Sequence, residues 1–170
     1  MKKLLLLLLI TFLFFGCAPT KKIIIIPDTY TEYQLEKVND LYLIDIILNG
    51  KKTKLLVDTG ASKSLLDINK KDYFGFSYSI QSLTKYTGIG GTTDIYAVYN
   101  YNVDLFFVSF LGADLFDIAK VFKMDGNKVI GILGSDFLIR TGAIIDYNTN
   151  KLYLNTGGRV YINPIGKALK

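Results

Sequence analysis

The chain has 170 residues, of which half are hydrophobic and 21% charged, with a formal net charge of +5. This length and composition are typical of one globular domain with a substantial core. The chain contains no histidine, and its single cysteine is Cys17. These two facts exclude Ser/His/Asp and Cys/His nucleophilic sites, histidine zinc sites, CxxC redox chemistry and intrachain disulfides. Carboxylates, hydroxyls, lysines and backbone amides are left to carry any chemistry.

The first 17 residues have the pattern of an export signal. Two lysines precede an apolar run over residues 4–15. That run is too short for a membrane-spanning helix, which needs about 20 residues, but it suits the h-region of a secretory signal. It leads to Cys17 in a pattern that resembles a bacterial lipobox, with Phe14 in place of the usual aliphatic residue. We expect residues 1–16 to be a lipoprotein signal peptide and Cys17 to be lipidated; an ordinary signal peptide with an incidental cysteine is the alternative.

Residues 17–30 are expected to be a tether between the lipidated cysteine and a folded domain over residues 31–170. Within the tether, residues 23–26 are a candidate edge strand. Ala18, rather than an aspartate, follows the cysteine, which favours the outer membrane of a bacterial envelope. The basic residues form no stripe interleaved with aromatic residues, so the sequence predicts a membrane contact through Cys17 and no nucleic-acid partner.

Short strand patterns separated by turns follow one another from Tyr33 onward. A strand over residues 41–48 is predicted to turn at Asn49-Gly50 into an antiparallel strand over residues 52–57. This pattern indicates an all-β barrel or sandwich. The further predictions are strands over residues 95–101, 103–110 and 116–122, a turn at Asp125-Gly126, one short helix over residues 135–140, and a hairpin of residues 143–147 and 152–155.

Asp58 directly follows the apolar residues 55–57, so its carboxylate is expected at the end of a buried strand. Burying an unpaired charge is costly, and such a group must be hydrogen-bonded, paired or protonated. Thr59 offers a hydroxyl, and Gly60 allows close approach of the backbone. These residues alone fit either a functional carboxylate or an Asx turn.

Three segments, in this order along the chain, resemble the active-site loop, the flap and the apolar-apolar-Gly segment of retropepsin-like aspartic proteases. The resemblance covers about residues 42–154. The three segments are Asp58, Thr59, Gly60, Ala61 and Ser62 in the loop; Ile89, Gly90 and Gly91 in a glycine-tipped hairpin over residues 86–93; and Ile132, Leu133 and Gly134 before the short helix.

The resemblance implies an all-β, closed acid-protease barrel with one short helix, and the activity of an aspartic endopeptidase. The chain carries one Asp-Thr-Gly, whereas the two-lobed pepsins carry two, so a homodimer with one Asp58 from each chain is implied. The two carboxylates would share a proton and activate the water that hydrolyses a peptide bond, without a metal or other cofactor. Thr59 would hold the two loops together, and the Gly60 carbonyl would accept a hydrogen bond from the substrate backbone.

The remaining resemblances concern the flap and the support of the loop. Gly90 and Gly91 would form the tight tip of a flap that closes over an extended peptide, and Ile89 would supply an apolar contact. Ile132 and Leu133 would pack beneath the active-site loop. Because Ser62 stands where several viral members have a second aspartate, their substrate contacts cannot be transferred.

Three other interpretations of the sequence are alternatives to the protease. The first is a catalytically silent envelope lipoprotein that binds a peptide or protein partner through the same barrel. The second is a glycan-acting enzyme with two carboxylates, but no second acid stands in a comparably apolar context beside a Gly turn. The third rests on Ser82 and Lys85, which match the S-x-x-K of penicillin-binding enzymes; the chain is short for that fold and no S-D-N follows.

A faint echo of the loop pattern occurs later in the chain. Residues 55–60 and 129–136 both run from an apolar strand into a Gly turn. Two related half-barrels would produce such an echo, and so would chance. Asp136 in the second segment is interpreted as an N-terminal helix residue favoured by the helix dipole. Asp146 is interpreted as structural.

Overall fold

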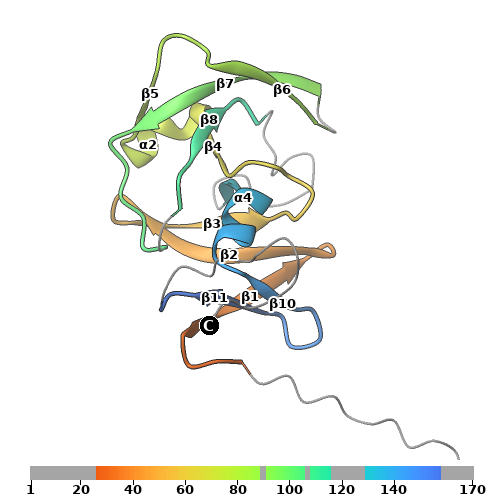
Figure 1. The fold of residues 1–170 in the computed structure, drawn as a ribbon. Helices are drawn as coiled ribbons and strands as arrows, with labels where there is room; N and C mark the ends of the chain where they lie inside the picture. Colours follow the sequence, from red (N-terminus) through yellow and green to blue (C-terminus); the bar gives the residue numbers. More distant parts are fainter. Residues whose placement is uncertain (1–25, 89–90, 106–107, 116–128, 158–170) are drawn as a thin grey trace, which may run out of the picture.

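The computed structural model describes residues 26–88, 91–105, 108–115 and 129–157. Strands dominate this part of the chain, and the all-β class is confirmed (Figure 1). In these four ranges no helix is both long and apolar enough to cross a membrane. The predicted strand over residues 116–122, the turn at Asp125-Gly126, the signal peptide and Cys17 lie outside the described residues.

Within the described ranges, eleven strands form one sheet, and the helices are short. The strands are β1 (Tyr30–Val38), β2 (Leu41–Leu48), β3 (Lys51–Val57), β4 (Leu65–Asp67), β5 (Ser77–Tyr78), β6 (Thr84–Gly88), β7 (Gly91–Tyr99), β8 (Leu111–Ala113), β9 (Val129–Leu133), β10 (Ile144–Asp146) and β11 (Lys151–Asn155). The helices are η1 (Ile68–Lys70), α2 (Lys71–Phe74) and α4 (Ser135–Arg140).

The sheet has two ends in the described part of the chain. Its strand order is β10-β11-β1-β2-β3-β9-β4-β8-β7-β5, with β6 paired to β7 beside this path. The expected closed barrel is therefore not formed by these strands, because β5 and β10 lie at opposite ends of the molecule and do not pair (Figure 1). The short α4 lies between the two halves of the sheet (Figure 1).

The hairpin of β2 and β3 is confirmed as predicted. Leu43, Ile44, Ile46 and Leu48 of β2 are buried, whereas Asp45 and Ile47 are exposed, which follows the two-residue period of a strand over much of its length. The turn residues Asn49 and Gly50 have φ angles of 48° and 78°. Asn and Gly tolerate this left-handed conformation best, and two such residues form the tight turn whose twist matches the paired strands.

The prediction of a strand over residues 103–110 is wrong. Val103 makes only an isolated bridge to Leu48, and the next strand, β8, begins at Leu111. Strand β7 also ends at Tyr99, before Asn100 with its φ of 58°. The apolar side chains of the misread segment, Leu105, Val108 and Phe110, are buried in the core without strand pairing. An apolar run marks burial, but it does not by itself distinguish a strand from a loop that crosses the core.

Two elements lack a clear local signal. Strand β1 begins at Tyr30, the last residue of the expected tether, and pairs with both β2 and β11. Five of its nine residues are exposed, as in a surface segment, and its pairing with β11 joins residues more than 100 positions apart. The four-residue helix α2 ends at Gly75, which has a φ of 75°.

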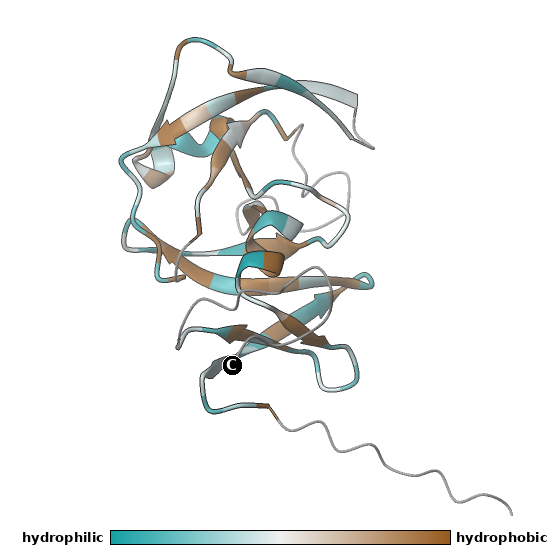
Figure 2. Cartoon of the chain, in the orientation of Figure 1, coloured by the Kyte–Doolittle hydropathy of each residue, from teal (hydrophilic) through white to brown (hydrophobic). Residues whose placement is uncertain are grey.

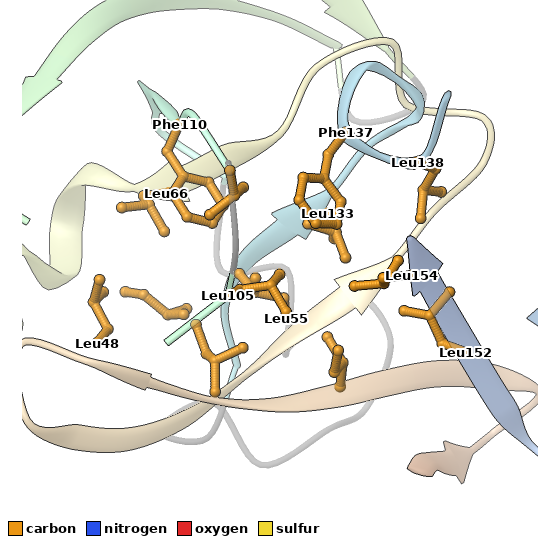
Figure 3. Packing of buried hydrophobic residues seen from close by; sticks show 14 of the residues in the cluster. Leu48, Leu55, Leu66, Leu105, Phe110, Leu133, Phe137, Leu138, Leu152 and Leu154 are labelled. Atoms are coloured by element: carbon orange, nitrogen blue, oxygen red, sulfur yellow. The ribbon is translucent and has the colours of Figure 1, made fainter. Parts of the chain in front are cut away.

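The main hydrophobic core lies between β2, β3, β9, β11 and α4 (Figure 3). Phe137 and Leu138 of α4 point into it, and Phe137 has no exposed surface. Complete burial of such a side chain stabilises the fold by about 1.5–3 kcal/mol. Figure 2 shows hydrophobic residues along the central strands and hydrophilic residues at the turns. The burial of Phe137 and Leu138 holds helix α4 against the sheet.

Candidate active site

The loop with Asp58 is positioned by three neighbouring strands, β3, β9 and β4, that pair side by side. Strand β9 pairs in parallel with β3, where Val57 faces Leu133, and antiparallel with β4, where Leu65 faces Ile132. Residues 58–64 connect β3 to β4, so they must pass over the end of β9 that lies between them. The two segments that echo each other in the sequence therefore lie side by side.

Asp58 is partly buried at the end of β3, and hydrogen bonds hold its backbone in place. Its N–H donates to the carbonyl of Leu133 at 3.1 Å, and its own carbonyl accepts from the N–H of Ala61 at 3.3 Å. Carboxylate Oδ1 accepts from the N–H of Gly60 at 2.8 Å. Oδ2 has no hydrogen-bond partner among the described residues. Asp58 thus forms an Asx turn with one oxygen and leaves the other available.

The segment predicted to support the loop does lie against it. The N–H of Ser135 donates to the carbonyl of Ala61 at 2.7 Å, and Leu133 is completely buried. A Cβ atom on Gly134 would lie 2.4 Å from the carbonyl oxygen of Lys63. Only glycine permits so close an approach of two backbones. The apolar-apolar-Gly pattern therefore allows β9 and α4 to meet residues 58–64.

Ser64 is part of this support, although the sequence interpretation did not single it out. Its side chain has no exposed surface, and Oγ accepts from the N–H of Gly134 at 3.0 Å. The same hydroxyl donates to Oδ1 of Asp136 at 2.7 Å, which also accepts from the N–H of Phe137 at 2.8 Å. Asp136 therefore ties α4 to the loop as well as lying at the helix N-terminus. The only indication of this role in the sequence is that Ser64, with its hydroxyl, directly precedes the apolar Leu65.

The predicted hairpin over residues 86–93 is confirmed. Strands β6 and β7 are antiparallel, and Gly88 pairs with Gly91, whose φ is 111°. Two hydroxyls face each other across this hairpin, those of Thr87 and Thr92, 2.9 Å apart. The tip residues Ile89 and Gly90 lie outside the described part of the chain.

One side chain connects this hairpin to the loop. The hydroxyl oxygen of Tyr86 lies 2.7 Å from Oγ of Ser62 and accepts from the N–H of Ser62 at 3.1 Å. Strand β6 is thereby held close to residues 58–62. The sequence interpretation included Tyr86 in the hairpin but did not predict this contact, because the two residues are 24 positions apart.

A second buried carboxylate, Asp67, ends β4 and has a structural role. It accepts from both the backbone N–H and the side-chain amide of Asn69, each at 3.1 Å, and so caps η1. Burial raises the pKa of Asp67 above its ordinary value. The carboxylate of Asp146 likewise serves its own turn, accepting from Thr149 Oγ1 at 2.7 Å and from the N–H of Asn148 at 2.9 Å. Among the residues described, no three His, Cys, Asp or Glu side chains are grouped as a metal would require.

Known proteins similar to this chain are aspartic proteases. The family described as aspartyl protease matches residues 44–137, more than half of the chain. Among curated proteins no match was found. A retropepsin-like aspartic protease from Rickettsia conorii is 20% identical, with a TM-score of 0.45 over 74% of this chain and 98% of that one. The EIAV protease, solved with the inhibitor HBY-793, is 20% identical, with a TM-score of 0.43 over 61% of this chain and 90% of that one.

A third similar structure is the retroviral protease-like domain of Ddi1 from Leishmania major. It is 17% identical, with a TM-score of 0.40 over 68% of this chain and 88% of that one. The matched family segment begins in β2 and ends in α4, and so contains the loop at Asp58, the hairpin of β6 and β7, and Gly134. The chain belongs to the aspartyl protease family.

Proposed function

We propose that the protein is an aspartic endopeptidase, active as a homodimer in which Asp58 of each copy supplies one carboxylate. The supporting observation is the geometry of Asp58. Its backbone is tied to β9 and to its own loop, Oδ1 is occupied by Gly60, and Oδ2 is available for a water or a second carboxylate. A single chain offers one such acid beside the flap, so the pair requires a second copy.

Two carboxylates at hydrogen-bond distance cannot both be ionised comfortably, so they hold one proton between them. The ionised carboxylate takes a proton from a water molecule, and the resulting hydroxide attacks the carbonyl carbon of the peptide bond. The protonated carboxylate donates a hydrogen bond to the carbonyl oxygen, on which negative charge develops. The tetrahedral intermediate then breaks its C–N bond as the carboxyl group that took the water's proton passes it to the amine leaving group.

The neighbouring residues have proposed roles in binding. Thr59 would contact its own copy across the dimer, and the Gly60 carbonyl would accept from the backbone of an extended peptide. The flap formed by β6 and β7, with Ile89, Gly90 and Gly91 at its tip, would close over that peptide and exclude water. The hydrogen bond between Tyr86 and Ser62 supports this role, because it connects the flap to the loop near the flap's tip.

The central test is the change Asp58→Asn, measured by cleavage of a diverse peptide library from about pH 3 to pH 8, the range that brackets carboxylate titration. Cleavage should be abolished while the circular dichroism spectrum and the unfolding midpoint are retained. Asp40→Asn, at an exposed carboxylate that pairs with Lys37, is the matched control and should cleave like the wild type. A wild type that dimerises but cleaves nothing would favour the silent binding lipoprotein instead.

Mixing two subunits tests whether the site is shared. When wild type and Asp58→Asn are refolded together in equal amounts, about a quarter of random pairs contain two intact aspartates. Activity should therefore fall to about a quarter of the same total protein as wild type. Activity of about half would mean that each copy works alone and would contradict the shared pair.

We also propose that the chain is anchored to a bacterial envelope membrane through a lipidated Cys17, with residues 1–16 removed as a signal peptide. The support is the sequence pattern of two lysines, an apolar run and a single cysteine. Labelling of growing bacteria with a radioactive fatty acid should mark the wild type and not Cys17→Ser. Equal labelling of both proteins would refute the anchor without affecting the peptidase proposal.

A further inference from the structure

An exposed lysine lies in the same loop as Asp58 and has no acid to pair with. Four other lysines, Lys37, Lys54, Lys71 and Lys151, each form an ion pair with at least one carboxylate. Lys63 is exposed and forms no ion pair with any residue in the described ranges. Its ammonium group is therefore available to an acidic group of another molecule.

The two carboxylates that contact this loop have other partners. Oδ1 of Asp136 accepts from Oγ of Ser64 at 2.7 Å and from the N–H of Phe137 at 2.8 Å. Oδ1 of Asp58 accepts from the N–H of Gly60 at 2.8 Å. The positive charge beside the proposed catalytic acid is thus not neutralised by the acids nearest to it in the fold.

The sheet topology brings this lysine close to Asp58. Asp58 directly follows β3, Lys63 stands two residues before β4, and both strands pair with β9 between them. Because neighbouring strands lie about 4.8 Å apart, the ends of β3 and β4 are about 10 Å apart. An extended peptide, at about 3.3 Å a residue, covers this distance in about three residues.

The flap meets the loop directly beside Lys63. The hydroxyl of Tyr86 in β6 lies 2.7 Å from Oγ of Ser62, the residue before Lys63. A second exposed lysine, Lys85, directly precedes Tyr86, but successive side chains of a strand point to opposite faces. Lys85 therefore points away from the loop, and in the register of the hairpin it faces Asp94. Of these two lysines, Lys63 is the one on the side of the flap where a peptide would lie.

We propose that Lys63 selects substrates that carry an aspartate or glutamate within about three residues of the cleaved bond. The inference rests on the proposed function, which places an extended peptide between the loop and the flap. The ammonium group attracts a carboxylate of the substrate and repels a lysine or arginine at the same position, so both effects contribute to selection. Lys63 binds one substrate side chain and takes no part in breaking the peptide bond.

The test is cleavage of a random peptide library at about pH 6, where Asp and Glu side chains are ionised. Mass spectrometry of the products identifies each cleaved bond. Within three residues of the bonds that the wild type cleaves, Asp and Glu should be enriched about two- to fivefold, as a partly exposed ion pair provides. Lys63→Glu should lose this enrichment and select Lys and Arg instead, whereas Lys63→Arg should retain it. Salt at about 1 M should weaken the selection, because it screens the charges.

Lys85→Glu is the matched control, because it makes the same change of charge on the other face of the flap strand. It should keep the preference of the wild type for acidic substrates. Circular dichroism and the unfolding midpoint check that all variants are folded. If Lys85→Glu loses the preference as fully as Lys63→Glu does, the overall charge of the protein is responsible and the inference is wrong.

Capture of peptides from the same library separates this inference from the proposed function. Immobilised Asp58→Asn should retain peptides enriched in Asp and Glu, and the double variant with Lys63→Glu should not. If the wild type cleaves peptides without any preference for acidic residues, the role of Lys63 is wrong and the peptidase proposal stands. If Lys63 selects the captured peptides but the wild type cleaves nothing, Lys63 is a recognition residue and the peptidase proposal fails. If no peptide is either captured or cleaved, both proposals are wrong.

Discussion

The hydroxyl of Ser64 joins the start of β4 to Asp136, 72 positions later in the chain, through a 2.7 Å hydrogen bond. On its other side the same oxygen accepts from the N–H of Gly134 at 3.0 Å. One buried side chain thereby fastens the loop after Asp58 to both the end of β9 and the first turn of α4. The position of the proposed catalytic carboxylate depends on this connection, because Asp58 is bonded to Leu133 beside it.

The change Ser64→Ala should destabilise the protein by about 1–3 kcal/mol, because it leaves the buried N–H of Gly134 without its acceptor. Chemical denaturation followed by circular dichroism measures this loss. We expect peptide cleavage per folded molecule to fall as well, since the loop loses its tie to α4. Ser109→Ala, at an exposed serine, should stay within about 0.5 kcal/mol of the wild type. Equal stability of the two variants would contradict a structural role for Ser64.

The change Gly134→Ala tests the close approach of α4 to the loop. Its new Cβ would lie 2.4 Å from the Lys63 carbonyl oxygen, so one of the two backbones must move. We expect a loss of about 1–3 kcal/mol in the free energy of unfolding, as for other overpacked sites. Gly88→Ala is the matched control, because a Cβ there meets nothing within 4 Å. Similar unfolding midpoints for the two variants would show that the backbones are further apart than described.

The change Tyr86→Phe removes only the hydroxyl that holds β6 to Ser62. The lost hydrogen bond should cost about 0.5–1.5 kcal/mol. If the flap closes over substrate, a flap that has lost its connection to the loop should raise KM more than it lowers kcat in peptide cleavage. Tyr99→Phe, at a 53% exposed tyrosine, serves as the control and should leave both constants unchanged. A Tyr86→Phe variant with wild-type kinetics would separate this contact from substrate binding.

Two aspartates should affect stability in opposite directions as the pH changes. Burial raises the pKa of Asp67 above its ordinary value of 3.8, so the folded state holds this proton more tightly than the unfolded chain does. Stability from this group is complete below pH 3.8 and is lost as the pH rises through the raised pKa. Asp67→Asn, which keeps an acceptor for Asn69, should remove this decline.

The Asp146 carboxyl behaves in the opposite way. Hydrogen bonds from the Thr149 side chain and from the Asn148 backbone lower its pKa below 3.8. Its contribution is present above pH 3.8 and is lost as the pH falls through the lowered value. Urea midpoints measured at a series of pH values should therefore show Asp67→Asn and Asp146→Asn diverging from the wild type with opposite pH dependence. Parallel curves for all three proteins would refute both assignments.

Local patterns alone determined several parts of this protein. The two-residue period of β2 and the Asn49-Gly50 turn predicted the first hairpin, and the glycines near Gly91 predicted the second. The residues before and within α4 predicted that helix with its bounds. Each of these features depends on neighbouring residues, so the sequence contains its signal directly. The order of the three segments was enough to predict the family.

The tertiary structure alone decided how these parts meet. The insertion of β9 between β3 and β4 brings Asp58 to Leu133 and Ser64 to Asp136, and the contact of Tyr86 with Ser62 joins the second hairpin to the same loop. Burial in the core also decided that Leu105 and Phe110 lie in a loop and not in a strand, since their apolar side chains pack in the main core whereas Val103 forms an isolated bridge to Leu48. A hydrogen bond between residues dozens of positions apart produces no pattern in the sequence around either residue. Which two residues meet depends on the tertiary fold that brings their segments together.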